Sequence, residues 1–154
     1  DSFESSYQMG PQKHRLYLLD LFKKKGIKTI LDVGCGTGCV FEIIRDRQYP
    51  FIYKGVDYSQ AMIEICKNTF IDSWNGQWEV QDARRLEERN NSWDCVLLLH
   101  CLDHLDDYKA AIKEAARVTK KYVCIVLWRS FVDEGTHFND LNMMGKKEGE
   151  EDGK

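Results

Sequence analysis

The 154-residue sequence lacks several features that would assign it to common classes of protein. It has no apolar run long enough to cross a membrane and no secretory signal at its start, so we expect neither a membrane partner nor secretion. It also lacks a basic excess, because 22 lysines and arginines face 25 acidic residues and the formal net charge is -3. Domains that grip a nucleic-acid backbone usually carry a basic face and a high pI, so nucleic acid is not the expected partner.

The six cysteines do not include a Cys-x-x-Cys pair. Several of them lie inside apolar runs, such as 93–97 and 122–126. Buried free thiols that behave as small apolar side chains explain this placement better than disulfides do. The cysteine pattern therefore favours a reducing compartment, and we predict a cytoplasmic location.

Predicted strands and helices alternate along the chain. Apolar residues at helical spacing predict helices over about 11–25, 38–47, 59–70 and 106–119, and β-branched or continuously apolar runs predict strands over about 28–33, 51–56, 76–80, 93–99 and 122–128. Strands that alternate with helices form a parallel sheet with helices on both faces. The expected fold is therefore α/β, a Rossmann-like doubly wound sheet of five strands.

The composition divides the chain into three parts. Residues 11–130 carry the alternating elements and form the predicted domain, preceded by an N-terminal segment or lid over 1–10. Residues 131–154 are polar and end in Lys146–Lys154, which holds seven charged residues and two glycines. Such a segment cannot bury apolar surface, so we expect a solvated tail or loop without stable structure.

A glycine-rich loop follows the first predicted strand, which ends near Asp32. The loop reads Gly34-Cys35-Gly36-Thr37-Gly38 and leads directly into a helix. Glycines allow a sharp turn and let a ligand approach the backbone without a Cβ in the way. Asp57 ends the second strand, where a carboxylate can accept both hydroxyls of a ribose. Strand, glycines, helix, second strand and terminal acid together predict a site for a nucleoside cofactor.

The neighbouring acids favour one nucleoside over another. A dinucleotide needs its pyrophosphate neutralised at the helix N-terminus. S-adenosylmethionine (SAM) carries a sulfonium cation instead, and Asp32 beside the glycines suits its cationic end. Asp82, after the third strand, could accept a hydrogen bond from the adenine amino group. An NAD-dependent oxidoreductase stays as an alternative, although it gives neither acid a role.

Several segments together resemble the class I SAM-dependent methyltransferases over roughly residues 10–130. Leu31–Gly38 resembles the first motif of that family, and the other matching segments are Val56–Ser59 with Met62, Gln81–Arg84, Trp93–Val96 through His104–Leu105, and Glu114–Val118. The resemblance implies an enzyme of EC class 2.1.1 that uses SAM and releases S-adenosylhomocysteine.

The resemblance also implies roles for individual residues. The glycine loop, Gly34, Cys35, Gly36 and Gly38, would line the methionine and ribose portions, and Asp32 would contact the amino end of the cofactor. Asp57 would hold the ribose, Tyr58 and Met62 would pack on the adenine, Asp82 and the N–H of Ala83 would read its edge, and Leu99 and His100 would pass near the methionine. In the helix over 11–25, Lys13, His14 and Arg15 either reach the cofactor carboxylate or form a solvated face.

The end of the chain departs from the family. The usual fold adds two antiparallel strands beside the fifth strand, but the residues after Trp128 are few, polar and glycine-containing. A truncated chain, an absent internal segment and a five-stranded sheet all explain this. An uncovered fifth strand would leave unpaired backbone N–H and C=O groups at the edge of the sheet, through which two copies could form a homodimer.

Methyl transfer needs alignment and exclusion of water, and a general base only if the acceptor loses a proton. His100 and His104 follow the fourth strand and are the candidate catalytic residues; packing or capping histidines are the alternative. His100-x-x-Asp103-His104 is similar to an inverted zinc motif, but that motif needs a helix and His100 ends a strand. We therefore expect no metal.

The sequence also limits the methyl acceptor. The place after the fourth strand reads Leu99–Leu102, without the Asn/Asp-Pro-Pro-aromatic motif typical of enzymes that methylate nucleobase or amide nitrogen. Together with the acidic balance, this favours a small-molecule acceptor. A SAM-binding or regulatory domain without catalysis is the alternative, because the final strands of the family are missing.

Overall fold

A computed structural model of the chain describes the backbone of residues 2–127 and 143–145 and the side chains of residues 13–127. In chain order the elements are α1 (Ser2–Lys24), β1 (Thr29–Val33), α2 (Cys39–Asp46), β2 (Ile52–Asp57), α3 (Gln60–Thr69), β3 (Gly76–Val80), β4 (Trp93–Leu99), a 3₁₀ turn (Leu102–His104), α4 (Tyr108–Val118), β5 (Thr119–Val126) and β6 (Met143–Gly145). None of the helices in these ranges is both long and apolar enough to cross a bilayer.

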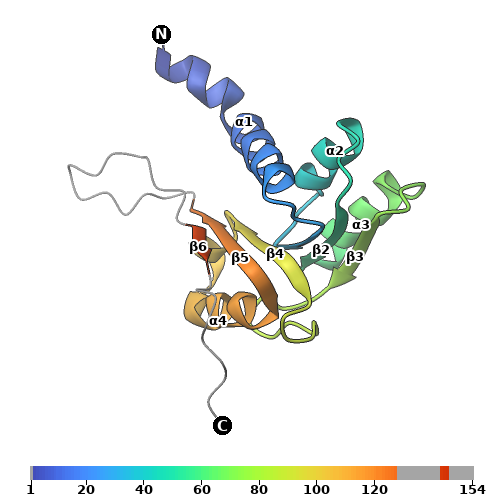
Figure 1. The fold of residues 1–154 in the computed structure, drawn as a ribbon, viewed down its shortest axis with the longest axis vertical. Helices are drawn as coiled ribbons and strands as arrows, with labels where there is room; N and C mark the ends of the chain where they lie inside the picture. Colours follow the sequence, from blue (N-terminus) through green and yellow to red (C-terminus); the bar gives the residue numbers. More distant parts are fainter. Residues whose placement is uncertain (1, 128–142, 146–154) are drawn as a thin grey trace, which may run out of the picture.

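The strands form one sheet in the order β3-β2-β1-β4-β5-β6 (Figure 1). Each pairing from β3 to β5 is parallel, and β6 alone runs antiparallel to its neighbour. The chain reverses its direction of winding between β1 and β4, so the carboxyl ends of these two strands flank the crevice where open α/β sheets bind ligands. The prediction of a doubly wound, Rossmann-like parallel sheet is confirmed.

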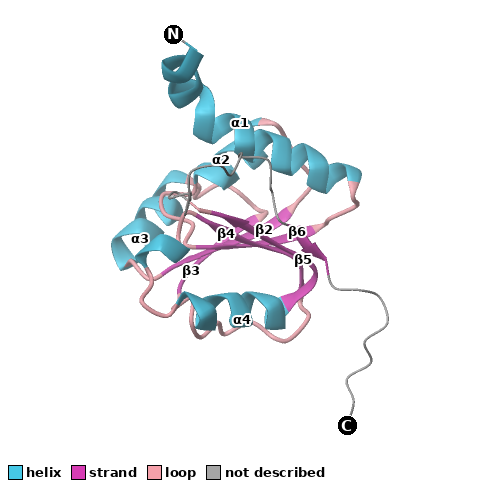
Figure 2. Cartoon of the chain, turned by 90° about the vertical axis from the view of Figure 1, so that its left-hand side faces the viewer, coloured by secondary structure: helices cyan, strands magenta, loops and turns pink. Residues whose placement is uncertain are grey.

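Two features differ from the sequence prediction of five strands and a first helix over 11–25. The sequence does not predict β6, because three residues, Met-Met-Gly, carry no alternating pattern; it pairs with β5 through Tyr122–Cys124 and covers part of an edge expected to be open. Helix α1 begins at Ser2, so Pro11 lies inside it and not in its first turn. Figure 2 shows α1 changing direction in its N-terminal part.

Three sequence predictions cannot be compared with the structure in full. The strand predicted over 122–128 begins earlier, at Thr119, and Trp128 lies outside the described residues. The same holds for most of the tail predicted over 131–154. The division into a lid over 1–10, a domain and a tail stays a prediction.

The sheet separates two layers of different composition. Helices α1, α2 and α3 cover one face and α4 covers the other (Figure 2). On the first face Phe41 is fully buried, with its ring centroid 5.1 Å from those of Tyr53 and Phe70 and 5.3 Å from that of Trp78. Such tilted and edge-to-face ring contacts stabilise beyond the area they bury. This aromatic cluster lies directly beneath the glycine-rich loop.

Side-chain caps fix where α3 and α4 begin. Asp107 accepts a hydrogen bond from the Ala110 N–H at 3.0 Å and so begins α4. Ser59 accepts one from the Met62 N–H at 3.4 Å and begins α3 directly after β2. The start of α3 is therefore fixed next to Asp57, the last residue of β2.

Candidate functional site

The glycine-rich loop is tied to the end of β2. The backbone N–H groups of Gly34 and Cys35 donate to the Val56 carbonyl at 2.8 and 3.1 Å. The Gly36 N–H donates to Asp57 Oδ2 at 2.9 Å. These three hydrogen bonds hold the loop at the carboxyl edge of the sheet, where the topology places a ligand crevice.

The three glycines of the loop are needed for different reasons. Gly34, Gly36 and Gly38 all have positive φ, at 77°, 54° and 82°, a region that side chains rarely adopt. A Cβ on Gly34 would lie 2.5 Å from the Cβ of Cys101, and one on Gly38 would lie 2.7 Å from Phe70. A Cβ on Gly36 would meet no atom within 4 Å. Gly34 and Gly38 therefore face protein, whereas Gly36 faces open space that a ligand can occupy.

The carboxylate of Asp57 is oriented by the backbone on both sides. Oδ2 accepts the Gly36 N–H, and Oδ1 accepts the Ser59 N–H at 2.9 Å. An ionised carboxylate has about four acceptor positions, so two remain for hydroxyl groups. Asp57 thus lies beside the open space at Gly36 with acceptor capacity to spare.

Asp32 is a buried acid behind the loop. It is 2% exposed, and its Oδ2 accepts a hydrogen bond from the Tyr53 hydroxyl at 2.7 Å. Burial raises the pKa of Asp32 to about 6, although the Tyr53 hydrogen bond and the positive charge of Arg15 act in the opposite direction. Its ionised form is therefore stabilised by any cation brought near the crevice.

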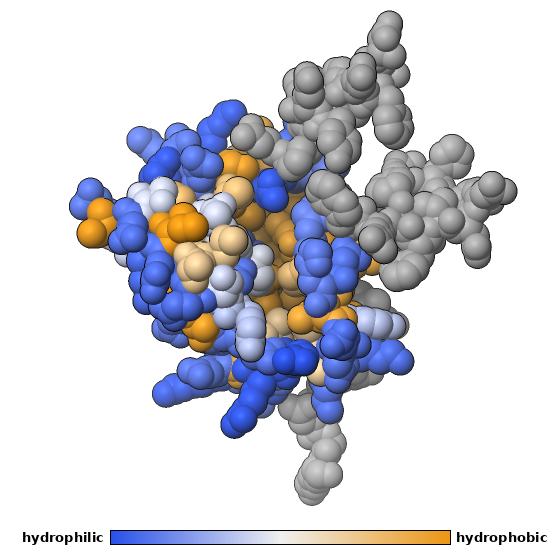
Figure 3. All heavy atoms as spheres, turned by 180° about the vertical axis from the view of Figure 1, so that it is seen from behind, coloured by the Kyte–Doolittle hydropathy of each residue, from blue (hydrophilic) through white to orange (hydrophobic). Residues whose placement is uncertain are grey.

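An open pocket of about 700 Å³ extends from Tyr58, the residue after Asp57. Its lining residues are Tyr58, Val80, Gln81, Asp82, Arg85, Leu86 and Glu87. This volume lies within the range of small-molecule sites. Figure 3 shows one face of the molecule, where apolar side chains are visible in a central recess between hydrophilic ones.

Asp82 is the acid in this pocket, and it is paired with Arg84. The Arg84 side chain contacts both carboxylate oxygens, with Nε 3.0 Å from Oδ1 and Nη2 2.7 Å from Oδ2. The Arg84 backbone N–H donates to Oδ1 as well, and these bonds hold the pKa of Asp82 below its usual value. The carboxylate is therefore fixed and charged, with acceptor capacity left for an amino group.

The two candidate catalytic histidines differ in environment. His100 follows β4 with a φ of 59°, and its backbone N–H donates to the Val126 carbonyl at 2.7 Å. Burial lowers the pKa of His100, and the charge of Arg15 lowers it further, so the ring is neutral at pH 7. His104 ends the 3₁₀ turn and is exposed. Only His100 combines partial burial with an unusual backbone conformation, a combination common at functional sites.

The other predicted site residues are spread around the crevice. The Cys35 side chain is 8% exposed and packs in the core beside Gly55, so only its backbone belongs to the loop surface. Leu99 is partly buried against the same core cluster. Met62 is 37% exposed on α3 and, like Ala83, is not among the residues that line the described pocket.

Sequence reasoning missed two residues that support the site. Tyr53 holds Asp32, and the Cys66 thiol donates to the Gly36 carbonyl at 3.2 Å. The signal for Tyr53 was its alternation with Gly55 along β2, which places it on the same face as Asp32 once the parallel register is known. No signal in the sequence distinguishes Cys66 from an ordinary apolar residue of α3.

Comparison with known proteins identifies the region that carries the site. The family model described as a methyltransferase domain matches residues 31–127, more than half of the chain. A ubiquinone biosynthesis O-methyltransferase of Coxiella burnetii is 31% identical over 94 residues, which cover 60% of this chain and 39% of that protein. A ubiquinone/menaquinone biosynthesis C-methyltransferase of Desulfotalea psychrophila is 29% identical over 118 residues, covering 74% of this chain and 47% of that protein.

Solved structures show the same fold. An N-methyltransferase of Haemonchus contortus, in complex with phosphomonomethylethanolamine and S-adenosylhomocysteine, superposes with a TM-score of 0.65 at 24% identity. The match covers 75% of this chain and 28% of that one. The chain spans less than half the length of the curated relatives described above.

Proposed function

The chain belongs to the family of class I SAM-dependent methyltransferases, and we propose that it binds SAM at the glycine-rich loop and transfers its methyl group to a small molecule. The observation that carries this proposal is the open space at Gly36 beside the oriented carboxylate of Asp57. Of the three glycines in the loop, Gly36 alone leaves such room, because Gly34 and Gly38 face protein.

The residues around the crevice fit a nucleoside that carries a positive sulfur. The free acceptor positions of Asp57 suit ribose hydroxyls, and the adjoining pocket at Tyr58 and Asp82 suits an adenine. The buried carboxylate of Asp32, with its pKa raised to about 6, is stabilised by a cation and destabilised by a pyrophosphate. This electrostatic preference favours SAM over NAD.

When bound, SAM supplies a methyl group on a sulfonium that is already a good leaving group. The work of the protein is then to hold and orient the cofactor and to exclude water. Arg15 is the residue we assign to the carboxylate end, because its charge is close enough to affect both Asp32 and His100. The glycine-rich loop and Asp57 hold the ribose portion.

The acceptor side is formed by residues after β4. Neutral His100 can take a proton from an acidic hydroxyl or carbon, which gives it the role of a general base for acceptors that lose a proton. The names of the two relatives, an O- and a C-methyltransferase, support a small acceptor of that kind. His104 is assigned a role in orienting the acceptor.

The first experiment is calorimetric titration of the full chain with SAM, S-adenosylhomocysteine and NAD. We expect the first two to bind and Asp57→Ala to weaken both by about 1–3 kcal/mol, the cost of leaving polar groups without their partner. Asp72→Ala, in an exposed loop, is the matched control and should bind as the wild type does. Binding of NAD without SAM would end the proposal.

The second experiment tests transfer. The chain is incubated with methyl-labelled SAM and extracts of small metabolites, with Gly36→Ala as the control that fills the open space at the loop. We expect label in a small molecule with the wild type and none with the variant. Tight SAM binding without transfer to any acceptor supports the alternative of a non-catalytic SAM-binding domain.

A further inference from the structure

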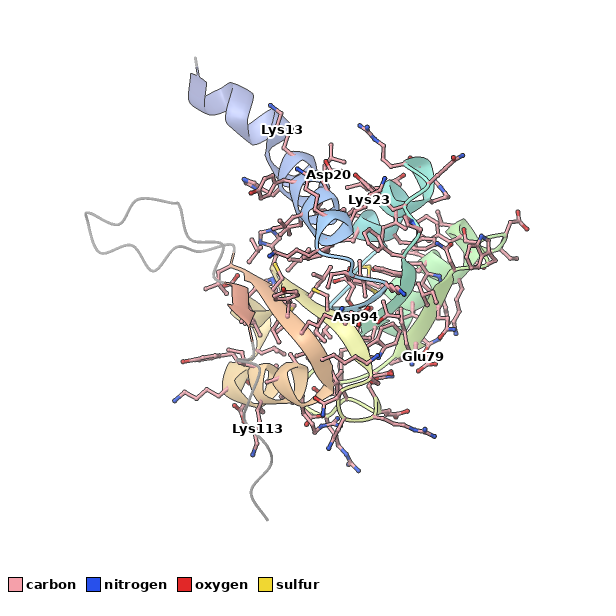
Figure 4. The ribbon with its side chains drawn as sticks, in the orientation of Figure 1. Lys13, Asp20, Lys23, Glu79, Asp94 and Lys113 are labelled. Atoms are coloured by element: carbon pink, nitrogen blue, oxygen red, sulfur yellow. The ribbon has the colours of Figure 1, made fainter. Side chains whose placement is uncertain are left out.

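Lys54 is a charged residue in the middle of a parallel strand. It lies in β2, is 8% exposed, and occupies the face of the sheet that carries α4. A buried ammonium is costly unless it is paired and hydrogen-bonded. Its Nζ lies 2.6 Å from Glu88 Oε1 and 2.7 Å from Glu79 Oε2. Figure 4 labels Glu79 on β3, at the edge of the sheet.

Gln81 bonds to both of the carboxylates that pair with Lys54, so the four side chains form one hydrogen-bonded network. Its Nε2 donates to Glu79 at 3.0 Å and to Glu88 at 3.2 Å, and its Oε1 accepts the Glu87 N–H at 3.1 Å. Gln81 is buried and the Glu88 side chain is 12% exposed, whereas the Glu79 side chain is 49% exposed, so the bond to Glu88 is the one shielded from water. The indole N–H of Trp93 donates to the second oxygen of Glu88 at 2.9 Å. The network therefore joins β2, β3 and β4 around one lysine.

The network holds the two ends of one loop. Residues 81–88, which we call the adenine-side loop, contain no helix or strand longer than an isolated bridge between Asp82 and Arg85. Gln81 begins this loop and Glu88 ends it. Glu88 pairs with Lys54, and the Gln81 side chain donates to the same Glu88 oxygen. Between them lie Asp82 and Leu86, which line the pocket beside Asp57.

Helix α4 holds the middle of the loop from another side. The Leu86 N–H donates to Glu114 Oε2 at 2.8 Å, and Arg117 Nη2 donates to the Leu86 carbonyl at 2.8 Å. This second support does not reach Asp82, which directly follows Gln81. The position of Asp82 relative to the pocket thus depends on Gln81, whose backbone N–H donates to the Asp57 carbonyl at 3.1 Å and whose side chain belongs to the Lys54 network.

The groups of the network are satisfied by one another. Burial opposes the charge of Lys54, yet its hydrogen bonds to Glu79 and Glu88 raise its pKa above the usual value. Burial also opposes the charge of Glu88, but bonds from Lys54, Trp93 and Gln81 lower its pKa. A depression of about 400 Å³ lies over these residues, and Lys54, Glu79 and Glu88 in its lining are already paired with one another, so we treat it as part of the support and not as a second ligand site.

We propose that Lys54 is a positioning residue for base recognition: through Glu88 and Gln81 it holds the adenine-side loop so that Asp82 reads the exocyclic amino group of the cofactor. This inference rests on the proposed function. It assigns a role in recognising the nucleobase to a residue that touches neither the base nor the reacting methyl group.

The test measures, for each protein, the dissociation constant of S-inosylhomocysteine divided by that of S-adenosylhomocysteine. S-adenosylhomocysteine carries the 6-amino group, and S-inosylhomocysteine carries a carbonyl in its place, so the ratio measures reading of the base. We expect the wild type to prefer the adenosyl compound. Lys54→Met should weaken it by about 3–10-fold, the equivalent of one lost hydrogen bond, and leave the inosyl compound nearly unchanged, so that the preference collapses.

The matched control is Lys121→Met, because Lys121 is also a strand lysine that faces a carboxylate, that of Asp94 at 3.9 Å. It lies on β5, away from the adenine-side loop, and should keep the wild-type ratio. If Lys54→Met does not fold, Glu88→Gln takes its place, because it keeps the shape and an acceptor for Trp93 while removing the charge. It should lower the ratio in the same direction.

The outcomes separate the inference from the function on which it rests. A wild type that binds neither compound contradicts the proposed SAM site itself. A wild type that binds both equally, or folded Lys54→Met and Glu88→Gln variants with an unchanged ratio, overturns the role of Lys54 in base recognition while leaving SAM binding intact. Faster amide exchange at Glu87 in the bound variants would accompany the expected loss of preference.

Discussion

On the face covered by α1, α2 and α3, the glycine-rich loop rests on packed rings, whereas on the α4 face the adenine-side loop rests on ion pairs. Phe41, Phe70 and Trp78 fill the space under Gly38 by ring-to-ring packing, with the Arg45 guanidinium 5.2 Å from the centroid of the Phe70 ring. Lys54 and Glu88 fill the corresponding space under the other loop. The glycine-rich loop therefore packs on apolar rings, whereas the loop proposed to recognise the base packs on oriented charged groups.

The two faces also respond to pH in opposite directions. Asp32, on the ring-packed face, has a raised pKa, so the folded protein loses stability as pH rises from about 4 to about 6. Hydrogen bonds from Lys54 lower the pKa of Glu79, and the bonds described above lower that of Glu88. These two groups contribute stability that is present above their unfolded pKa and lost as pH falls.

The largest effect is expected from emptying the ring cluster. Phe41→Ala removes a fully buried side chain that touches three other rings, so we expect the free energy of unfolding to fall by about 3–5 kcal/mol. Urea denaturation followed by tryptophan fluorescence measures this loss. A loss below about 1 kcal/mol would mean that the cluster does not carry the stability of this face.

A smaller effect with a pH signature is expected from Asp32→Asn. The amide still accepts from the Tyr53 hydroxyl but cannot ionise. Above pH 6 the variant without ligand should be more stable than the wild type by about 1–3 kcal/mol, and near pH 4 the two should be equal. Denaturation at several pH values gives the difference curve. A constant difference across that range would show that Asp32 does not titrate as its burial requires.

The smallest effect is expected from Arg117→Lys on the α4 face. Arg117 donates to the carbonyls of Leu86 and Glu88, each at 2.8 Å, and a lysine cannot reproduce that fork. We expect the free energy of unfolding to fall by about 1–2 kcal/mol. The adenine-side loop should become more mobile, most of all at Leu86. Amide exchange at that residue, compared with Met62 as an internal reference, is the measurement. Equal exchange in both proteins would show that the Arg117 hydrogen bonds are not needed to fix the loop at Leu86.

Much of the fold was predictable because its signals are local. The run Thr29–Val33, the glycines after it and the acid Asp57 lie in one stretch of chain, and their order fixes the topology. The strand β6 was not predictable, since its pairing with β5 depends on a distant edge and not on its own three residues. The start of α1 before Pro11 also goes against the local signal, which places proline in a first turn.

The supports of the site were harder to predict than its surface. The glycine loop and Asp57 form a motif that can be recognised in the sequence, and the structure brings them into direct contact. Tyr53 and Lys54 are neighbours in β2 with opposite tasks, one under Asp32 and one under the adenine-side loop. Their tasks follow from which face each side chain takes, and the partners come from segments 21 to 34 residues away along the chain.

Because the winding reverses between β1 and β4, two successive segments of the chain form the two sides of the crevice. The residues proposed to handle the cofactor lie within 32–88, apart from Arg15 in α1 and Leu99 at the end of β4, and the proposed acceptor side begins at His100. If the proposed function holds, codon changes confined to the segment after β4 alter which molecule is methylated and leave the residues for the methyl donor unchanged. A combinatorial library over residues 100–107 is the economical route to new acceptors on this scaffold.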